Sequence, residues 1–201
     1  MDRNQRCVVA LSLLFPALAM AQKSVCDQSL DELIQHATRQ EMEQCLAMRG
    51  MPVNAKVRPI DFPLHDAALR GYVDVVRLLL KMKYAVDAPD AQGNTALHNA
   101  ALKGRLEVVS ALLDAGAAPN AFSRNGSTPL HEAALGGNSK VIELLVSKGA
   151  SVDAVDAEGN TPLHLAAAFE RKDAIDALLR AHANPRMANK RGQTPAIDLR
   201  P

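Results

Sequence analysis

The histidines are the first candidates for chemical function in this sequence, because imidazole rings bind metal ions and act as general acids or bases. Four of the six stand in copies of one short phrase, so an explanation for one must serve for all four. The copies are "FPLHDAA" with His65, "TALHNAA" with His98, "TPLHEAA" with His131 and "TPLHLAA" with His164.

The phrases recur with a fixed period. Leu64, Leu97, Leu130 and Leu163 precede the four histidines at intervals of 33 residues, and Ala196 lies another 33 residues on. A fixed period of this size indicates an array of stacked repeats, each too small to bury its apolar face alone. Each copy continues with a second apolar run, such as Val75 to Leu80.

This pattern resembles the ankyrin repeat over nearly the whole chain. The shared features are T-P-L-H-x-A, a glycine in the middle of the repeat, and a closing G-A-x-x-N/D. The resemblance implies an all-α solenoid of 33-residue helix–turn–helix repeats with β-hairpin-like turns. This sequence departs from the pattern at four positions, where the pattern does not predict the local turn geometry: Phe62, Ala96, Glu170 and His182.

We expect a leader at 1–21, followed by one ankyrin-repeat domain at 22–201. The 33-residue period divides this domain into repeats. A divergent N-terminal cap repeat is expected at about 27–60, because charged residues there replace the alanines of the later copies. We expect the last unit to end in its first helix. The full repeats are 61–93, 94–126, 127–159 and 160–192, and the truncated C-terminal unit is 193–201.

Local chemistry supports the same elements. Thr-Pro at a helix start supplies a hydroxyl cap and a residue whose missing N–H is not needed in the first turn. Asp87 with Asp90, and Asp153 with Asp156, are predicted to bond the local backbone of the turns rather than to form a catalytic pair. Positive φ is predicted at the glycines between units, Gly93, Gly126, Gly159 and Gly192.

The resemblance makes the histidines of the phrase structural residues that bond the neighbouring repeat. Stacked repeats would hold His65, His98, His131 and His164 roughly 10 Å apart, the spacing of packed helices, which is too far for a shared zinc. No phosphate loop, nucleophile elbow or Cys/His cluster is present, so we expect no enzyme activity, cofactor or metal. The alternative is an enzyme, or a metal or haem carrier, that uses His36, His182 or the cysteines.

The N-terminus predicts export. Arg3 and Arg6 precede an apolar run from Cys7 to Met20, and Ala19-Met20-Ala21 matches a signal-peptidase site, so cleavage is expected after Ala21. The run is short for a membrane-spanning helix, and we expect no span after cleavage. The expected location is the bacterial periplasm.

Cleavage would leave Cys26 and Cys45 in an oxidising compartment. Two short helices, at about 24–38 and 40–48, would each place their cysteine on an apolar face. A disulfide bond between them would stabilise the fold by roughly 3 kcal/mol. The alternative is a pair of buried thiols.

Composition gives no reason to expect a nucleic-acid or membrane partner, since the formal net charge is +1 and aromatic residues make up 3% of the chain. We expect a monomer.

In ankyrin arrays partners meet the turn tips and the exposed side of the first helices, and the resemblance carries this surface onto matching positions. The predicted surface consists of Arg58, Leu69, Arg70, Gln92, Leu102, Lys103, Phe122, Arg124, Asn125, Leu135, Glu158 and Phe169.

The expected function is therefore a non-catalytic, exported protein that binds another protein. Bacterial periplasmic ankyrin proteins that it resembles support oxidative-stress enzymes such as catalase. Others act as immunity proteins against toxins, and an adaptor acting inside a host is a third alternative.

Overall fold

The structure, a computed structural model, describes residues 63–197, which belong to one compact unit, Pro59–Pro201. The predicted leader, the cap repeat, Cys26, Cys45 and Arg58 lie outside the described residues. Within residues 63–197 the helices are α4 (Pro63–Arg70), α5 (Val73–Lys81), α6 (Ala96–Leu102), α7 (Leu106–Asp114), α8 (Pro129–Gly136), α9 (Ser139–Ser147), α10 (Pro162–Ala168) and α11 (Lys172–Arg180).

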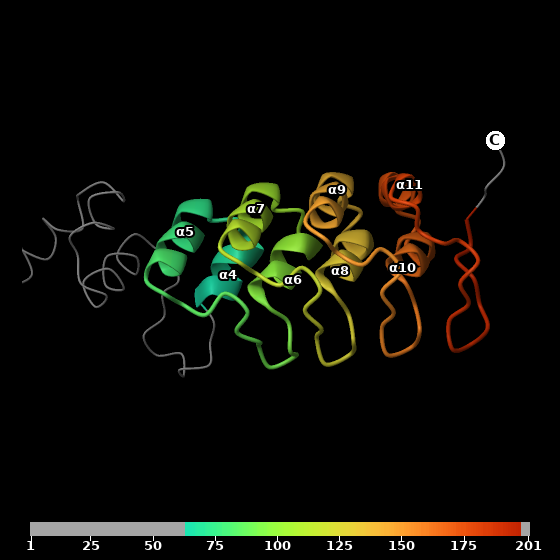
Figure 1. Ribbon diagram of the computed structural model, residues 1–201, viewed down its shortest axis with the longest axis horizontal. Helices are drawn as coiled ribbons and strands as arrows, with labels where there is room; N and C mark the ends of the chain where they lie inside the picture. Colours follow the sequence, from blue (N-terminus) through green and yellow to red (C-terminus); the bar gives the residue numbers. More distant parts are fainter. Residues whose placement is uncertain (1–62, 198–201) are drawn as a thin grey trace, which may run out of the picture. The chain divides into compact units, whose positions relative to one another are not determined.

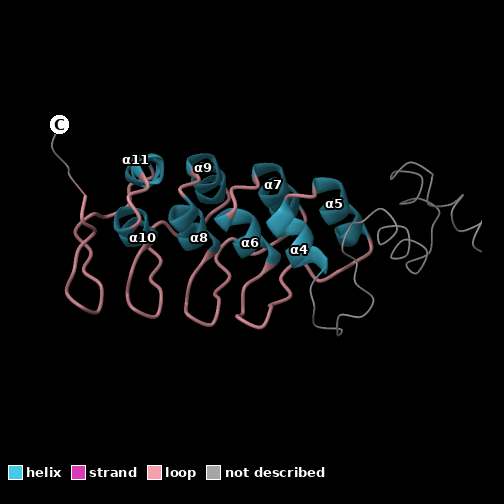
Figure 2. Cartoon of the chain, turned by 180° about the vertical axis from the view of Figure 1, so that it is seen from behind, coloured by secondary structure: helices cyan, strands magenta, loops and turns pink. Residues whose placement is uncertain are grey.

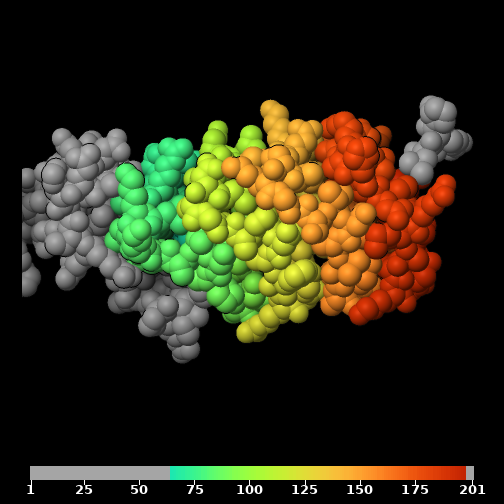
Figure 3. Space-filling model, in the orientation of Figure 1, coloured from blue at the N-terminus to red at the C-terminus, as the bar shows by residue number. Residues whose placement is uncertain are grey.

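The helices form two layers, and all of the long loops project to one side of them (Figures 1 and 2). One layer contains the first helix of each repeat, in the order α4, α6, α8 and α10, and each packs on the next. The other layer contains α5, α7, α9 and α11, again in chain order. Successive repeats lie in contact along the described part of the chain (Figure 3). Over the described residues this arrangement is the all-α solenoid that the resemblance implied.

The first helices begin where the sequence predicts. Thr95, Thr128 and Thr161 are the N-cap residues of α6, α8 and α10, and each has an extended backbone. Pro129 and Pro162 follow the caps of α8 and α10, where a residue without an N–H loses no helical bond.

The core is built from leucines and alanines that recur with the repeat. Leu97, Leu130 and Leu163 of the first helices are fully buried, and so are Leu112 and Leu145 of the second helices. Burying one such leucine contributes roughly 1.5–3 kcal/mol. The alanine pairs of the phrase are also buried, and their small side chains let neighbouring first helices approach closely. These pairs are Ala67–Ala68, Ala100–Ala101, Ala133–Ala134 and Ala166–Ala167.

Backbone hydrogen bonds also join the loop tips of neighbouring repeats. The N–H of Arg124 donates to the Gln92 carbonyl at 2.9 Å, and the N–H of Ala157 donates to the Asn125 carbonyl at 2.9 Å. The N–H of Lys190 continues the series to the Glu158 carbonyl at 3.0 Å. Each tip is therefore held by the tip before it.

A second series of bonds corrects one prediction about the aspartates. Asp90 and Asp156 do bond their own turns, since Asp90 Oδ1 accepts from the N–H groups of Gln92 and Asn94, both at 2.8 Å, and Asp156 accepts equivalently. The prediction was wrong for Asp87 and Asp153, which reach across to the next repeat. Asp87 accepts from the Ala118 N–H at 3.1 Å, and Asp153 accepts from the Asn184 N–H at 2.9 Å. Both aspartates stand near the start of their loops, where a backbone N–H of the next repeat lies within hydrogen-bond distance of the carboxylate.

The glycines between units have the predicted positive φ, and the repeats without a glycine keep the same turn geometry. Glu170 and His182, which replace glycines, have φ of 54° and 65°. Both side chains therefore accept a left-handed backbone, which ordinarily costs roughly 1–2 kcal/mol per residue.

Neighbouring repeats explain where a side chain is tolerated. A Cβ on Gly104 would collide with the Asn138 side chain of the next repeat, whereas a Cβ on Gly116 would meet nothing within 4 Å. Lys83 and His182 occupy the same repeat position as Gly116, where only the backbone angle opposes a side chain.

The C-terminal unit differs from the prediction. Thr194 and Pro195 match a helix start, yet residues 193–197 are not helical. In the earlier repeats the histidine three residues after the threonine accepts the threonine N–H, as His164 does for Thr161 at 3.1 Å. Ile197 stands at that position here and has no acceptor, so the first turn lacks this bond.

The glycine geometry predicts two different costs. Gly116→Ala should lower the free energy of unfolding by about 1–2 kcal/mol, because only the left-handed backbone opposes it. Gly104→Ala should cost at least about 1 kcal/mol more, since the Asn138 side chain must also move. Urea denaturation of the two variants beside the wild type measures both values, and equal costs would contradict this account.

Candidate functional site

Each of the four phrase histidines bonds a backbone carbonyl of the following repeat. His65 Nε2 lies 3.0 Å from the Asn94 carbonyl oxygen, and His98 Nε2 lies 3.1 Å from that of Ser127. His131 and His164 repeat the contact with Asn160 at 3.0 Å and Gln193 at 2.9 Å. A carbonyl oxygen only accepts, so Nε2 carries the proton and donates in every case.

The other ring nitrogen is engaged inside the repeat. Nδ1 of His98, His131 and His164 accepts the N–H of the N-cap threonine at 3.0, 3.2 and 3.1 Å. The threonine hydroxyl lies 2.9 or 3.0 Å from the same nitrogen. With both nitrogens bonded and the rings buried, these three imidazoles offer no lone pair to a metal ion and no proton to a substrate.

No group of three His, Cys, Asp or Glu side chains within residues 63–197 is placed to hold a metal ion. His182 is exposed, and His36 lies outside the described residues. The helices of the described part have at most 9 residues, far fewer than a lipid bilayer requires, and no candidate membrane span is found among them.

Two of the large exposed apolar side chains lie in the long loops, and a third lies at the end of α10. Phe122 lies in the loop between α7 and α8 and is 64% exposed, and Val155, at the same position of the next loop, is 46% exposed. Phe169, the C-cap residue of α10, is 53% exposed. Exposed apolar residues that lie together can mark a protein-interaction site, so the matching positions of Phe122 and Val155 on neighbouring loops make this the informative part of the surface.

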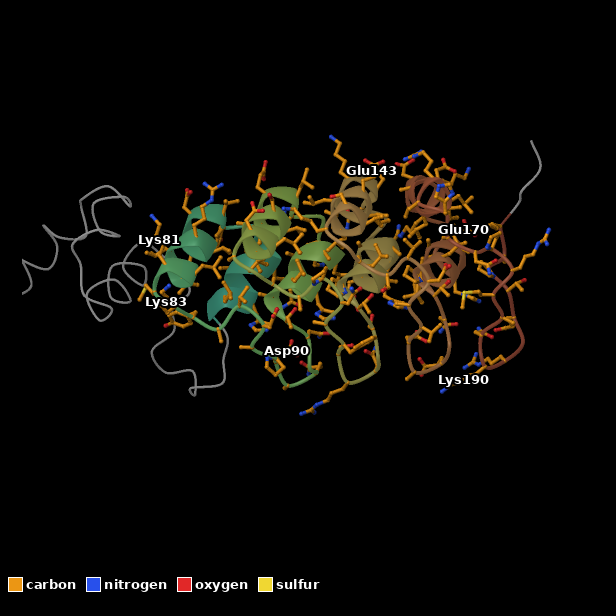
Figure 4. All side chains as sticks on the ribbon, in the orientation of Figure 1. Lys81, Lys83, Asp90, Glu143, Glu170 and Lys190 are labelled. Carbon is orange, nitrogen blue, oxygen red and sulfur yellow. The ribbon has the colours of Figure 1, made fainter. Side chains whose placement is uncertain are left out.

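Four polar residues of the predicted surface lie on the loop tips. Gln92, Arg124, Asn125 and Glu158 are all exposed there. The series of backbone bonds between the loop tips, here called the tip ladder, places Gln92 beside Arg124 and Asn125 beside Ala157 of the next tip. Figure 4 shows this side of the molecule with Asp90 and Lys190 on the first and last loops, opposite Glu143 on α9.

The helical part of the predicted surface is less exposed. Leu69, Leu102 and Leu135 are half-buried, and their carbonyls bond side chains of the next repeat. Arg105 Nε donates to Leu69 at 3.3 Å, Asn138 donates to Leu102 at 3.1 Å, and Arg171 Nε donates to Leu135 at 3.0 Å. These leucines therefore combine packing with partial exposure.

Two basic residues beside the leucines differ in their contacts. Arg70 is exposed and forms an ion pair with Asp66 at 2.9 Å, which reduces its freedom to bind a partner. Lys103 is exposed at the end of α6. Ala168 was absent from the predicted surface, although it is exposed, and its place 33 residues after Leu135 was the signal that could have found it.

Comparison with known protein families identifies the family to which the repeats belong. The family described as "Ankyrin repeats (3 copies)" matches residues 33–123 and 116–189, which is more than half of the chain. The chain belongs to the ankyrin-repeat family. A comparison with curated proteins found no match. Ankyrin repeats are typically non-catalytic modules that bind proteins, and the family membership therefore indicates an interaction module.

Burial of the ankyrin histidines changes their titration. Desolvation lowers the pKa of His65, His98 and His131 below the ordinary value of 6.5, and the carbonyl bonds oppose this shift only in part. Below pH 6.5 these three histidines therefore bind more protons in the unfolded chain than in the folded one. Their contribution to the free energy of unfolding is fully present above about pH 6.5 and is lost as the pH drops below it.

His131→Ala tests both roles of the ring. At pH 7.5 it should lower the free energy of unfolding by about 1–2 kcal/mol, because buried partners lose their bonds. The variant should also lose less stability than the wild type between pH 7.5 and pH 5, since one group with a lowered pKa is gone.

His182→Ala is the matched control, because His182 is exposed. Urea denaturation at the two pH values supplies the comparison. An unchanged pH dependence in His131→Ala would contradict the titration account.

Proposed function

We propose that this protein is a non-catalytic, exported ankyrin-repeat protein that binds a protein partner in the periplasm. The observation that carries the proposal is the exposure of two phenylalanines, Phe122 in the loop before α8 and Phe169 at the end of α10. Aromatic residues are common among the few side chains that carry most of the binding energy of an interface.

The loops that carry Phe122 and its neighbours are fixed before any partner arrives. Ser123 follows Phe122 directly and is buried, and its N–H donates to the Ser127 carbonyl at 2.9 Å. The tip ladder then holds Arg124 to Gln92. A surface that is already ordered loses little conformational entropy on binding, which favours affinity.

Charge and exposure along the first helices favour the C-terminal half of the described array as the centre of the interface. The N-terminal repeats present Arg70, already paired with Asp66, and Lys103. The last full repeat presents Phe169 at the position of Arg70 and Lys103, and Leu165 at the position of Asp66. Interface centres are depleted in charge and enriched in aromatic and apolar contacts, whereas charged residues suit the rim.

For the role of the complex we propose support of an oxidative-stress enzyme such as catalase, the role of periplasmic ankyrin proteins that the sequence resembles. Capture from a periplasmic extract with the wild-type protein, followed by mass spectrometry, identifies the partner. If the captured partner is a toxin, the protein acts as an immunity protein instead.

The interface prediction concerns the two phenylalanines. Replacing both Phe122 and Phe169 with alanine should weaken binding of the captured partner by at least about 2 kcal/mol, because truncating a central aromatic anchor has this cost. The free energy of unfolding should change by no more than about 0.5 kcal/mol, since both residues are exposed. Calorimetric titration and urea denaturation measure the two quantities.

The matched control replaces Glu107 and Lys140 with alanine, which are exposed residues of α7 and α9. Both assays should give wild-type values for this variant. If the phenylalanine variant binds normally, the interface lies elsewhere, and the proposed surface is wrong.

Export has its own test. The protein recovered from the periplasm should begin at Gln22, and its native form should contain no reactive thiol, because Cys26 and Cys45 would be joined. Intact mass and thiol titration without reductant check the two statements. An unprocessed N-terminus would contradict export by a cleavable signal, and two reactive thiols would contradict the bridge.

A further inference from the structure

A cavity of about 340 Å³ opens between α10, the loop before it and the segment that follows the last loop. Leu165 and Ala168 of α10 contribute apolar side chains, and Pro195 and Ala196 contribute the opposite wall. This volume lies at the lower end of the range of small-molecule sites, so it suits one large side chain.

The cavity exists because the last unit departs from the repeat pattern. Ala196 occupies the position of Leu97, Leu130 and Leu163, which are fully buried in the earlier repeats. Ala196 is smaller, is exposed, and belongs to a segment that is not helical. An apolar position that closes the core elsewhere is thus open to solvent here.

Three uncharged polar side chains of the cavity wall, Asn160, His164 and Asn189, already have hydrogen-bond partners. Asn189 Nδ2 donates to Asn160 Oδ1 at 2.8 Å, and the His164 ring bonds through both nitrogens. The wall therefore does not require a polar ligand. What it leaves for a ligand is the apolar surface of Leu165 and Ala168.

Two opposite charges line the same cavity. Glu158 and Arg191 lie at equivalent positions of neighbouring loops, both are exposed, and neither forms an ion pair with another described residue. Their backbones are fixed, because the Glu158 N–H donates to Asp156 Oδ1 and the Arg191 N–H donates to Asn189 Oδ1, both at 3.0 Å. A carboxylate and a guanidinium thus stand beside an apolar hollow.

We propose that this cavity receives one apolar side chain of an extended segment of the partner protein, with an acidic residue beside it at Arg191 and a basic residue at Glu158. The inference rests on the proposed function and names the chemistry that the partner presents. Charges of both signs beside an apolar floor disfavour a simple anion or cation as the ligand. They fit a peptide that carries both charges and is apolar between them.

Nuclear magnetic resonance of the full, ¹⁵N-labelled chain tests this inference with two peptides. The probes are acetyl-Gly-Asp-Phe-Lys-Gly-amide and the same peptide with Asp and Lys exchanged, because an extended segment can enter in either direction. One of them should shift the amide signals of Ala168, Gly192 and Thr194. Replacing its Phe with Ser should weaken binding by about tenfold or more, as loss of a buried apolar group predicts.

Two variants locate the binding. Ala168→Arg should abolish the shifts by filling the cavity, while circular dichroism stays unchanged because Ala168 is exposed. Arg191→Glu should weaken binding about two- to fivefold, the range of an exposed ion pair. Arg186→Glu, an exposed residue that does not line the cavity, should leave binding unchanged. Shifts that persist in Ala168→Arg, or the absence of shifts with either peptide, would overturn the inference.

The other occupant to test is the chain's own end. If removal of residues 198–201 raises peptide affinity more than about tenfold, the end of the chain competes for the cavity, and the proposal of a partner segment is wrong. The proposed function is judged separately. Partner capture that depends on Phe122 but tolerates Ala168→Arg would retain the interaction module and reject this cavity as its contact.

Discussion

A hydrogen bond from a buried imidazole to a carbonyl 29 residues further on connects each described repeat to the next. In three of the repeats the same ring also accepts the N–H at the start of its own helix. One side chain therefore sets both the helix start and the register between repeats. This double role explains why histidine, which looks chemically active in the sequence, is used as a structural residue. A ring that lost either bond would leave a buried polar group without a partner.

The other features of the array follow from this close stacking. The leucines and alanines of the phrase are buried because neighbouring first helices approach closely. The glycine after the first helix is required where the next repeat places a side chain against it, as Asn138 does at Gly104. Where no atom of the next repeat approaches, as at Gly116, other repeats carry a lysine or a histidine. Tolerance to substitution is thus decided by the neighbouring repeat and not by the turn alone.

The sequence predicted the period, the helices and the positive-φ turns, because each depends on residues within one repeat. It did not predict which aspartates bond the next repeat, since Asp87 and Asp90 look alike until the distance between repeats is known. The non-helical segment at 193–197 was also missed, although Ile197 in place of the histidine was the signal. For the surface, the exposure of Phe122 and Phe169 agrees with the expectation from their positions. The cavity beside Ala168 was not predictable, because it arises from what a neighbouring segment leaves unfilled.

The ladder of loop tips has a mechanical consequence. Between neighbouring loops there is a single backbone bond, such as that from Arg124 to Gln92, and a few side-chain bonds, such as that from Lys190 Nζ to the Ala157 carbonyl, whereas the helical layers are held by broad apolar contact. Bending that separates the loops therefore breaks a few hydrogen bonds per repeat, while bending that separates the helices exposes core leucines. The array is consequently more compliant toward opening on the loop side, and it can adjust its curvature to the shape of a bound protein without disturbing its core.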